Sequence, residues 1–111
     1  ENFAGALPTW LSPVQAVVIP VSDKFSDYAA EVRDQLIARR IRTEADLRNE
    51  KLGYKIREAQ LEKIPYMLIV GENERSAGTV SVRKRGEGDI GVRTVAETVE
   101  MIDRDIDGKY Y

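Results

Sequence analysis

The chain has 111 residues, the size of one domain, and its 42% hydrophobic content with eight glycines and four prolines is ordinary for a globular protein. It has no cysteine and no histidine, which excludes disulfides and thiolate zinc and removes the commonest general base and metal ligand. No apolar run approaches the roughly 18 residues of a membrane span and no signal-like leader is present, so we expect a soluble, cytoplasmic protein without a membrane partner.

Charge is distributed unevenly along the chain. The formal net charge is −2, yet residues 39–85 carry twelve Lys or Arg against seven Asp or Glu, whereas the remainder carries five against twelve. Because salt screens charges beyond about 8 Å, local charge decides whether phosphates are attracted. The middle of the chain is therefore suited to face a nucleic acid, and solvated helix and loop faces are the alternative interpretation.

The first two thirds of the chain predict strands and helices in alternation. Residues 14–21 and 66–70 are almost continuously apolar, which is typical of strands buried on both faces. Between them the pattern predicts a helix capped by Ser26 and ending near residue 40, a strand over 41–46, and a helix over 51–63 that stops before Pro65. Strands that alternate with helices in this way pair in parallel through right-handed crossovers.

The last third predicts strands of a different kind and one more helix. In residues 79–84, Val80 and Val82 fall on one face, so Arg83 should avoid the apolar layer on that side. Glycines surround a short segment near Ile90, and residues 94–97 (TVAE) fit a capping box before a helix with an acidic exterior, which we expect on the side away from a nucleic acid. Together the elements predict an α/β domain of three layers, with a mixed sheet of about five strands and about three helices.

The segment 46–71 (DLRNEKLGYKIREAQLEKIPYMLIVG) is the most informative part of the sequence. It contains no metal-ligand or nucleophile spacing, and its polar groups suit holding a polyanion and reading a base edge: Arg48, Asn49, Lys51, Lys55 and Arg57. We therefore expect binding rather than catalysis, with no catalytic residue and no metal site. Asn49 could instead cap the following helix, and for Lys55 and Lys63 we favour solvated helix positions. Gly53 is interpreted as a point of close approach between the helix and the sheet or an RNA.

Three segments carry a resemblance to a known family: residues 3–15 (FAGALPTWLSPVQ), 45–58 (ADLRNEKLGYKIRE) and 64–74 (IPYMLIVGENE). In this order they resemble the C-terminal anticodon-binding domain of class II aminoacyl-tRNA synthetases, in the version found in threonyl-tRNA synthetases. The resemblance implies that residues 1–13 connect to a catalytic domain and that residues 14–111 form the anticodon-binding domain. It also implies a homodimeric parent enzyme that joins threonine to tRNA with ATP and Mg and carries Zn in its catalytic domain, whereas this fragment has no cofactor and no catalytic activity.

The resemblance also assigns roles to five residues. Asn49 corresponds to the asparagine that contacts the last anticodon base, a uridine in threonine tRNAs, and an amide can pair with the O4 and N3 groups of that base. Lys51 and Arg57 would attract the RNA backbone, with Arg57 also placed to touch the uridine. Glu74 and Arg83 would read the middle guanine together, although from the residues alone Glu74 is only a turn residue. The rival function is a protein-interaction or accessory-subunit module of the same fold that does not bind RNA.

Overall fold

The computed structural model describes residues 7–108. A five-stranded mixed sheet forms the middle of the molecule. The strands are β1 (Ala16–Pro20), β2 (Thr43–Ala45), β3 (Tyr66–Val70), β4 (Thr79–Lys84) and β5 (Gly88–Thr94), in the order β2-β1-β3-β4-β5. The three strands β2, β1 and β3 are parallel, whereas β4 runs antiparallel to β3 and β5 antiparallel to β4. The mixed five-stranded sheet is thus confirmed.

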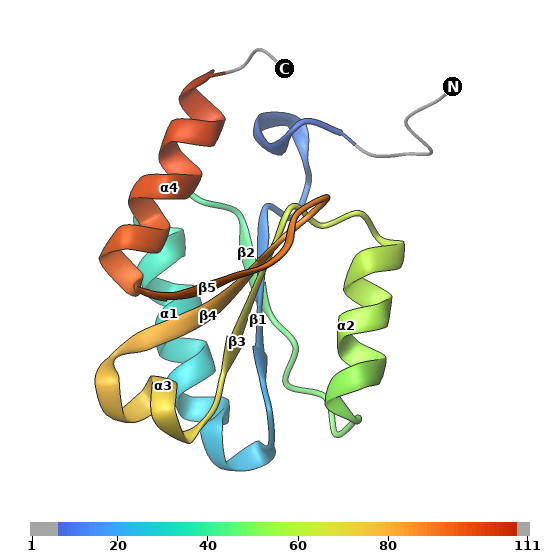
Figure 1. Ribbon diagram of the computed structural model, residues 1–111, viewed down its shortest axis with the longest axis vertical. Coiled ribbons are helices and arrows are strands. Elements are labelled where there is room, and N and C mark those ends of the chain that lie inside the picture. Colours follow the sequence, from blue (N-terminus) through green and yellow to red (C-terminus); the bar gives the residue numbers. More distant parts are fainter. Residues whose placement is uncertain (1–6, 109–111) are drawn as a thin grey trace.

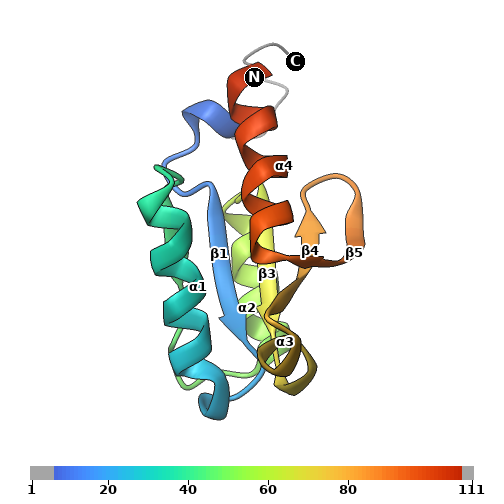
Figure 2. The same cartoon turned by 90° about the vertical axis from the view of Figure 1, so that its left-hand side faces the viewer.

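Helices cover both faces of this sheet (Figure 1). The α-helices are α1 (Ser26–Ala38), α2 (Leu52–Leu61), α3 (Glu72–Ala77) and α4 (Val95–Gly108), and two 3-10 turns, η1 (Thr9–Leu11) and η2 (Asp23–Phe25), precede α1. Helices α1 and α4 lie together on one face, as Figure 2 shows from their side, and α2 lies on the other. The three layers are therefore confirmed. Among the described residues no helix has the length and apolar character needed to cross a membrane.

The structure has one α-helix more than the sequence predicts. Helix α3 spans six residues and buries none of them, so it lacks the apolar stripe by which a helix is recognised in a sequence. It ends at Gly78, whose left-handed backbone (φ 71°) stops the helix and leads into β4.

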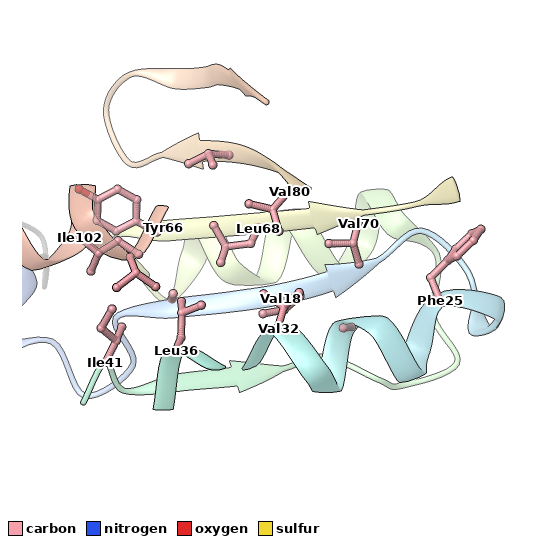
Figure 3. Packing of buried hydrophobic residues seen from close by; sticks show 14 residues of the cluster. Val18, Phe25, Val32, Leu36, Ile41, Tyr66, Leu68, Val70, Val80 and Ile102 are labelled. Carbon is pink, nitrogen blue, oxygen red and sulfur yellow. The ribbon is translucent and has the colours of Figure 1, made fainter. Parts of the chain in front are cut away.

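Two apolar layers hold the sheet between its helices. The larger layer joins α1 and α4 to the sheet and includes Val18, Leu68 and Val80 (Figure 3). The smaller one lies under α2 and includes Val17, Met67 and Ala59. Neighbours in β1 and β3 contribute alternately to the two layers, which is why these strands read as continuous apolar runs.

The predicted caps have different outcomes. At the start of α4, Thr94 N donates to Glu97 Oε1 at 2.9 Å and Glu97 N donates to Thr94 Oγ1 at 3.0 Å, so the capping box is confirmed. The predicted cap at Ser26 is wrong. Because η2 runs directly into α1, Ser26 already has helical backbone angles (φ −60°, ψ −39°) and is the first residue of the helix.

The described part of the N-terminal segment packs on the domain. Thr9 is buried and its Oγ1 donates to Asp105 Oδ2 at 2.7 Å, and the Gln15 side-chain amide donates to the backbone oxygen of Thr9 at 3.0 Å. Arg42 Nη2 donates to the backbone oxygen of Ser12 at 2.7 Å. Residues 1–6, and with them most of FAGAL, lie outside the described residues. The assignment of residues 1–13 as a connection to a catalytic domain stays a prediction.

Candidate nucleic-acid interface

The α2 side of the sheet is only partly covered. Helix α2 packs on residues of β1 and β3, whereas β4 and β5 add no buried apolar side chain to that layer. Ser81 on β4 is half-buried, and its partner on β5, Val92, keeps 62% of its surface exposed. This leaves an open strip of sheet beside α2.

Arg83 lies on this open strip. It pairs with Met67 of β3, whose side chain belongs to the layer under α2, and follows Val82, which points into the opposite layer. Arg83 also lines a pocket of about 130 Å³ together with Gln60 and Met67. The prediction that Arg83 avoids the Val80 side is therefore confirmed.

Two further cations border the same side of the domain. Arg57 is exposed on α2, one helical turn before Gln60, which lines the pocket next to Arg83. Lys51 is exposed at the N-cap position of α2. The structure thus brings Arg57 and Arg83 to one face from different elements, with Lys51 at the beginning of the helix.

Asn49 lies at the tip of the loop between β2 and α2. Glu50 N donates to the backbone oxygen of Arg48 at 2.9 Å, which closes a three-residue turn centred on Asn49. The residue is exposed, and its side chain forms no hydrogen bond with another described residue. Helix α2 has Lys51 as its N-cap residue and no side-chain cap, so the capping role considered for Asn49 is wrong. The amide is left available to a partner.

Arg48 and Lys55, which the sequence groups with the polyanion-binding residues, are already engaged within the domain. Arg48 Nε and Nη2 donate to the two carboxylate oxygens of Asp46, each at 2.8 Å, and Nη2 also donates to Glu58. These hydrogen bonds hold the pKa values of Asp46 and Glu58 below their usual range. Both carboxyl groups are therefore ionised at neutral pH.

Lys55 is buried rather than solvated, so the expectation of a solvated position is wrong. Only 4% of its surface is exposed, and Nζ donates to the backbone oxygen of Asp46 at 2.9 Å. The backbone oxygen of Asp46 therefore satisfies the ammonium group, as a buried lysine requires. Lys63 is half-buried at the end of α2, with a left-handed backbone (φ 60°).

Glu74 occupies a structural position in α3. Its Oε1 accepts a hydrogen bond from Gly71 N at 2.8 Å, immediately before the helix. The sequence alone describes it as a turn residue, and the structure places it as the side chain that fixes the start of α3.

The structure does not bring Glu74 and Arg83 into contact. Arg83 pairs with Met67 at the beginning of β3, whereas Glu74 follows the end of that strand. From Met67 to Val70 the strand advances by about 10 Å. Arg83 therefore lies beside the beginning of β3 on the α2 side, whereas Glu74 lies beyond the other end of that strand.

Arg85 is a residue whose role the sequence does not predict. Its Nη1 donates to the backbone oxygen of Lys63 and its Nη2 to that of Leu7, both at 2.7 Å. Arg85 thereby joins the end of α2 to the N-terminal segment. From the sequence, Lys84 and Arg85 suit phosphate contacts, or the RKR run at residues 83–85 protects a strand edge, and no sequence signal points to two backbone carbonyls as partners.

The opposite face of the sheet carries the acidic helix. Helix α4 packs on the α1 side through Val99 and Ile102, and its acidic residues are Glu97, Glu100, Asp103, Asp105 and Asp107. Helix α4 and helix α2 thus lie on opposite faces, and the expectation that α4 lies on the side away from a nucleic acid stays a prediction. The acidic residues of α4 and the exposed Lys51 and Arg57 of α2 therefore lie on opposite sides of the sheet.

Comparisons with known proteins agree with this architecture. The family model described as "Anticodon binding domain" matches residues 15–105. The chain is 58% identical over 105 residues to a threonine–tRNA ligase of Nitratidesulfovibrio vulgaris, which covers 95% of the chain and 16% of the relative. It is 53% identical to the threonine–tRNA ligase of Halorhodospira halophila, over 97% of the chain and 17% of that relative.

A solved structure gives the same result. The crystal structure of the RNA binding domain of threonyl-tRNA synthetase from Cryptosporidium parvum Iowa II superimposes with a TM-score of 0.87 at 33% identity, covering 93% of this chain and 26% of that one. The chain thus spans only a small part of the length of the curated relatives it matches, and over that part both sequence and fold agree. The chain belongs to the family of anticodon-binding domains.

Proposed function

We propose that this chain is the anticodon-binding domain of a threonine–tRNA ligase and that it binds the anticodon loop of threonine tRNA. The observation that carries the proposal is similarity to threonine–tRNA ligases over 95% of the chain. The geometry supports it, because Asn49 is displayed on a loop tip without an internal partner and Arg83 lies on an open strip of sheet.

The chemistry of these groups suits unpaired bases. An anticodon loop offers unstacked bases whose edges a protein can read. In this proposal Asn49 pairs with the uridine at the last anticodon position, and the guanidinium fork of Arg83 meets the O6 and N7 atoms of the middle guanine. Glu74 would accept from the N1 and N2 donors of the same guanine through the carboxylate oxygen that does not cap α3. Lys51 and Arg57 would attract the phosphates.

The remaining parts of the activity belong to the longer protein. A catalytic domain in the same polypeptide would join threonine to tRNA with ATP and Mg, with Zn in that domain, and the whole enzyme would be a cytoplasmic homodimer. Residues 1–13 would connect the two domains. This fragment would then select tRNA without making or breaking a bond.

Filter binding of threonine tRNA transcripts tests the proposal. The domain should prefer guanine to cytosine at the middle anticodon position, and Arg83→Ala should weaken that preference. Lys51→Ala should weaken binding to all transcripts alike. Because one phosphate contact is lost, the slope of log affinity against log salt should become shallower by about 0.7. Arg104→Ala removes an exposed cation from α4 on the opposite face and serves as the matched control with no expected effect.

Two results would contradict the proposal. Equal affinity for guanine and cytosine at the middle position would remove base recognition. No measurable binding of any transcript, by the domain or by the full-length protein, would favour a protein-interaction module. If Arg83→Ala prefers guanine to cytosine at the middle position as strongly as the wild type does, only the proposed role of Arg83 is wrong.

A further inference from the structure

Arg48, the neighbour of Asn49, is fixed at both of its ends. Its backbone oxygen accepts the hydrogen bond from Glu50 N that closes the turn around Asn49. Its guanidinium donates to both carboxylate oxygens of Asp46 and to Glu58 of α2. Arg48 therefore connects the turn around Asn49 to Asp46, which precedes the loop, and to Glu58 of α2, which follows it.

Those fixed points are themselves held by the core. Asp46 N donates to the backbone oxygen of Val18 at 2.9 Å, which continues the pairing of β2 with β1. The buried Lys55 donates from Nζ to the backbone oxygen of Asp46 at 2.9 Å. Since Lys55 and Glu58 both belong to α2, the loop is secured to the helix as well as to the sheet. The position of Arg48 is thereby determined by the two elements that flank the loop.

The charge around Arg48 makes it a poor phosphate ligand. Its single positive charge is opposed by the carboxylates of Asp46 and Glu58, and together with the ammonium group of Lys55 the cluster has no net charge. A phosphate that approaches Arg48 must compete with two carboxylates that already accept hydrogen bonds from its guanidinium. The guanidinium also lies over the ring of Tyr54, 5.8 Å from its centroid, which covers part of its surface. Arg48 is exposed like Lys51 and Arg57, but among the described residues it has carboxylate partners and they form no ion pair.

We propose that Arg48 is a positioning residue for base recognition, which acts through Asn49 and does not touch the RNA. The Asp46–Arg48–Glu58 clamp holds the turn so that the Asn49 amide points outward in one orientation before tRNA arrives. A side chain that is already ordered, as proposed for Asn49, loses less conformational entropy when it binds a base, and this favours discrimination between bases. This inference rests on the proposed role of Asn49 in anticodon binding.

A double-mutant cycle with transcripts that carry uridine or cytosine at the last anticodon position tests this inference. Arg48→Gln should lower the preference for uridine by about fivefold or more, because a good paired contact to a base is worth roughly 1–3 kcal/mol. Asn49→Ala should lower it at least as much, and adding Arg48→Gln to Asn49→Ala should cause no further loss. Arg48→Lys keeps the charge but loses the planar guanidinium that donates to both oxygens of Asp46. Its preference for uridine should therefore fall as in Arg48→Gln.

The salt dependence separates positioning from phosphate contact. Arg48→Gln should leave the slope of log affinity against log salt unchanged, whereas Lys51→Ala should reduce it. A loss for all transcripts alike with a smaller slope would identify Arg48 as a phosphate ligand and overturn the inference. Additive effects of Arg48→Gln and Asn49→Ala would overturn it as well.

Amide hydrogen exchange tests the clamp without tRNA. In Arg48→Gln the amide of Glu50, which closes the turn, should exchange faster, while the core amide of Leu68 should keep its wild-type protection. Unchanged exchange at Glu50 would overturn the inference. If the wild-type domain prefers uridine but Arg48→Gln keeps that preference, the inference alone fails. If the wild-type domain shows no preference at any anticodon base, the proposed function fails.

Discussion

Tyr66 and Asp105 form a hydrogen bond between the sheet and the last helix: the Tyr66 hydroxyl on β3 donates to Asp105 Oδ2 on α4 at 2.8 Å. The same oxygen accepts from Thr9 Oγ1 at 2.7 Å. One carboxylate oxygen therefore links a buried strand, a surface helix and the N-terminal segment. Asp105 reads in the sequence as one of several acidic surface residues, and the structure makes it an anchor.

Tyr66→Phe should change the pH dependence of stability. Burial, together with the hydrogen bond to Asp105, raises the pKa of Tyr66 above its ordinary value near 10. The stability that this group contributes is therefore present below about pH 10 and is lost as the pH rises further. We expect Tyr66→Phe to cost about 1 kcal/mol near neutral pH and to reduce the loss of stability above pH 10. Urea unfolding between pH 7 and 11 measures both effects.

The alkaline effect should be reduced rather than abolished. Tyr28 also has a raised pKa, again chiefly through burial, and its hydroxyl donates to the backbone oxygen of Thr79 at 2.7 Å. If Tyr66→Phe loses stability above pH 10 as steeply as the wild type, then ionisation of Tyr66 does not cause the alkaline loss of stability.

Glu74 should show separable structural and recognition roles. Glu74→Ala removes the acceptor for Gly71 N and should destabilise the domain by about 1 kcal/mol. Glu74→Gln keeps an oxygen in the same place and should remain close to wild-type stability, but it loses the negative charge offered to guanine. We expect both variants to lose preference for the middle guanine in filter binding. Full preference in Glu74→Gln would limit this residue to its structural role.

Gly53→Ala tests why a glycine occupies the first turn of α2. A Cβ at this position would meet no atom within 4 Å, so close approach of the helix to the sheet does not require it. The substitution should therefore stabilise the domain by about 0.5 kcal/mol, because alanine is the better helix former. If the tRNA backbone approaches here, binding should weaken while stability rises. Unfolding and filter binding on the same protein measure the two effects.

Gly78→Ala provides the opposite result for comparison. Gly78 also has open space around it, but its φ of 71° lies in the left-handed region that disfavours side chains. We expect a loss of about 1 kcal/mol in urea unfolding. A gain in stability would show that α3 can end by another route.

Arg85→Ala should loosen the junction between the N-terminal segment and α2. The backbone oxygens of Lys63 and Leu7 would each lose a hydrogen bond, and we expect a loss of about 1–3 kcal/mol. Arg104→Ala, on the surface of α4, should stay within about 0.5 kcal/mol of the wild type. Equal stability of the two variants in urea would show that the bonds of Arg85 contribute no net stability.

The sequence by itself determined the features whose physical cause is local. The apolar runs at 14–21 and 66–70 predict buried strands because neighbouring side chains point to opposite faces of a sheet, and the strands are observed at 16–20 and 66–70. The same alternation placed Arg83 opposite Val82, and the spacing of Thr94 and Glu97 fixed the start of α4. The resemblance carried by residues 45–58 and 64–74 predicted the family that the comparisons confirm.

The tertiary structure decided which polar groups are engaged and which remain available. Arg48 and Asn49 are neighbours with similar polarity in the sequence, yet Glu58, ten residues away, engages the first and nothing among the described residues engages the side chain of the second. Lys55 is buried because the carbonyl of Asp46 lies beside it, and Asp105 is an anchor because β3 and the N-terminal segment meet there. Such partners are brought together only when distant segments of the chain pack against each other. The periodicity of the sequence therefore cannot predict these hydrogen bonds.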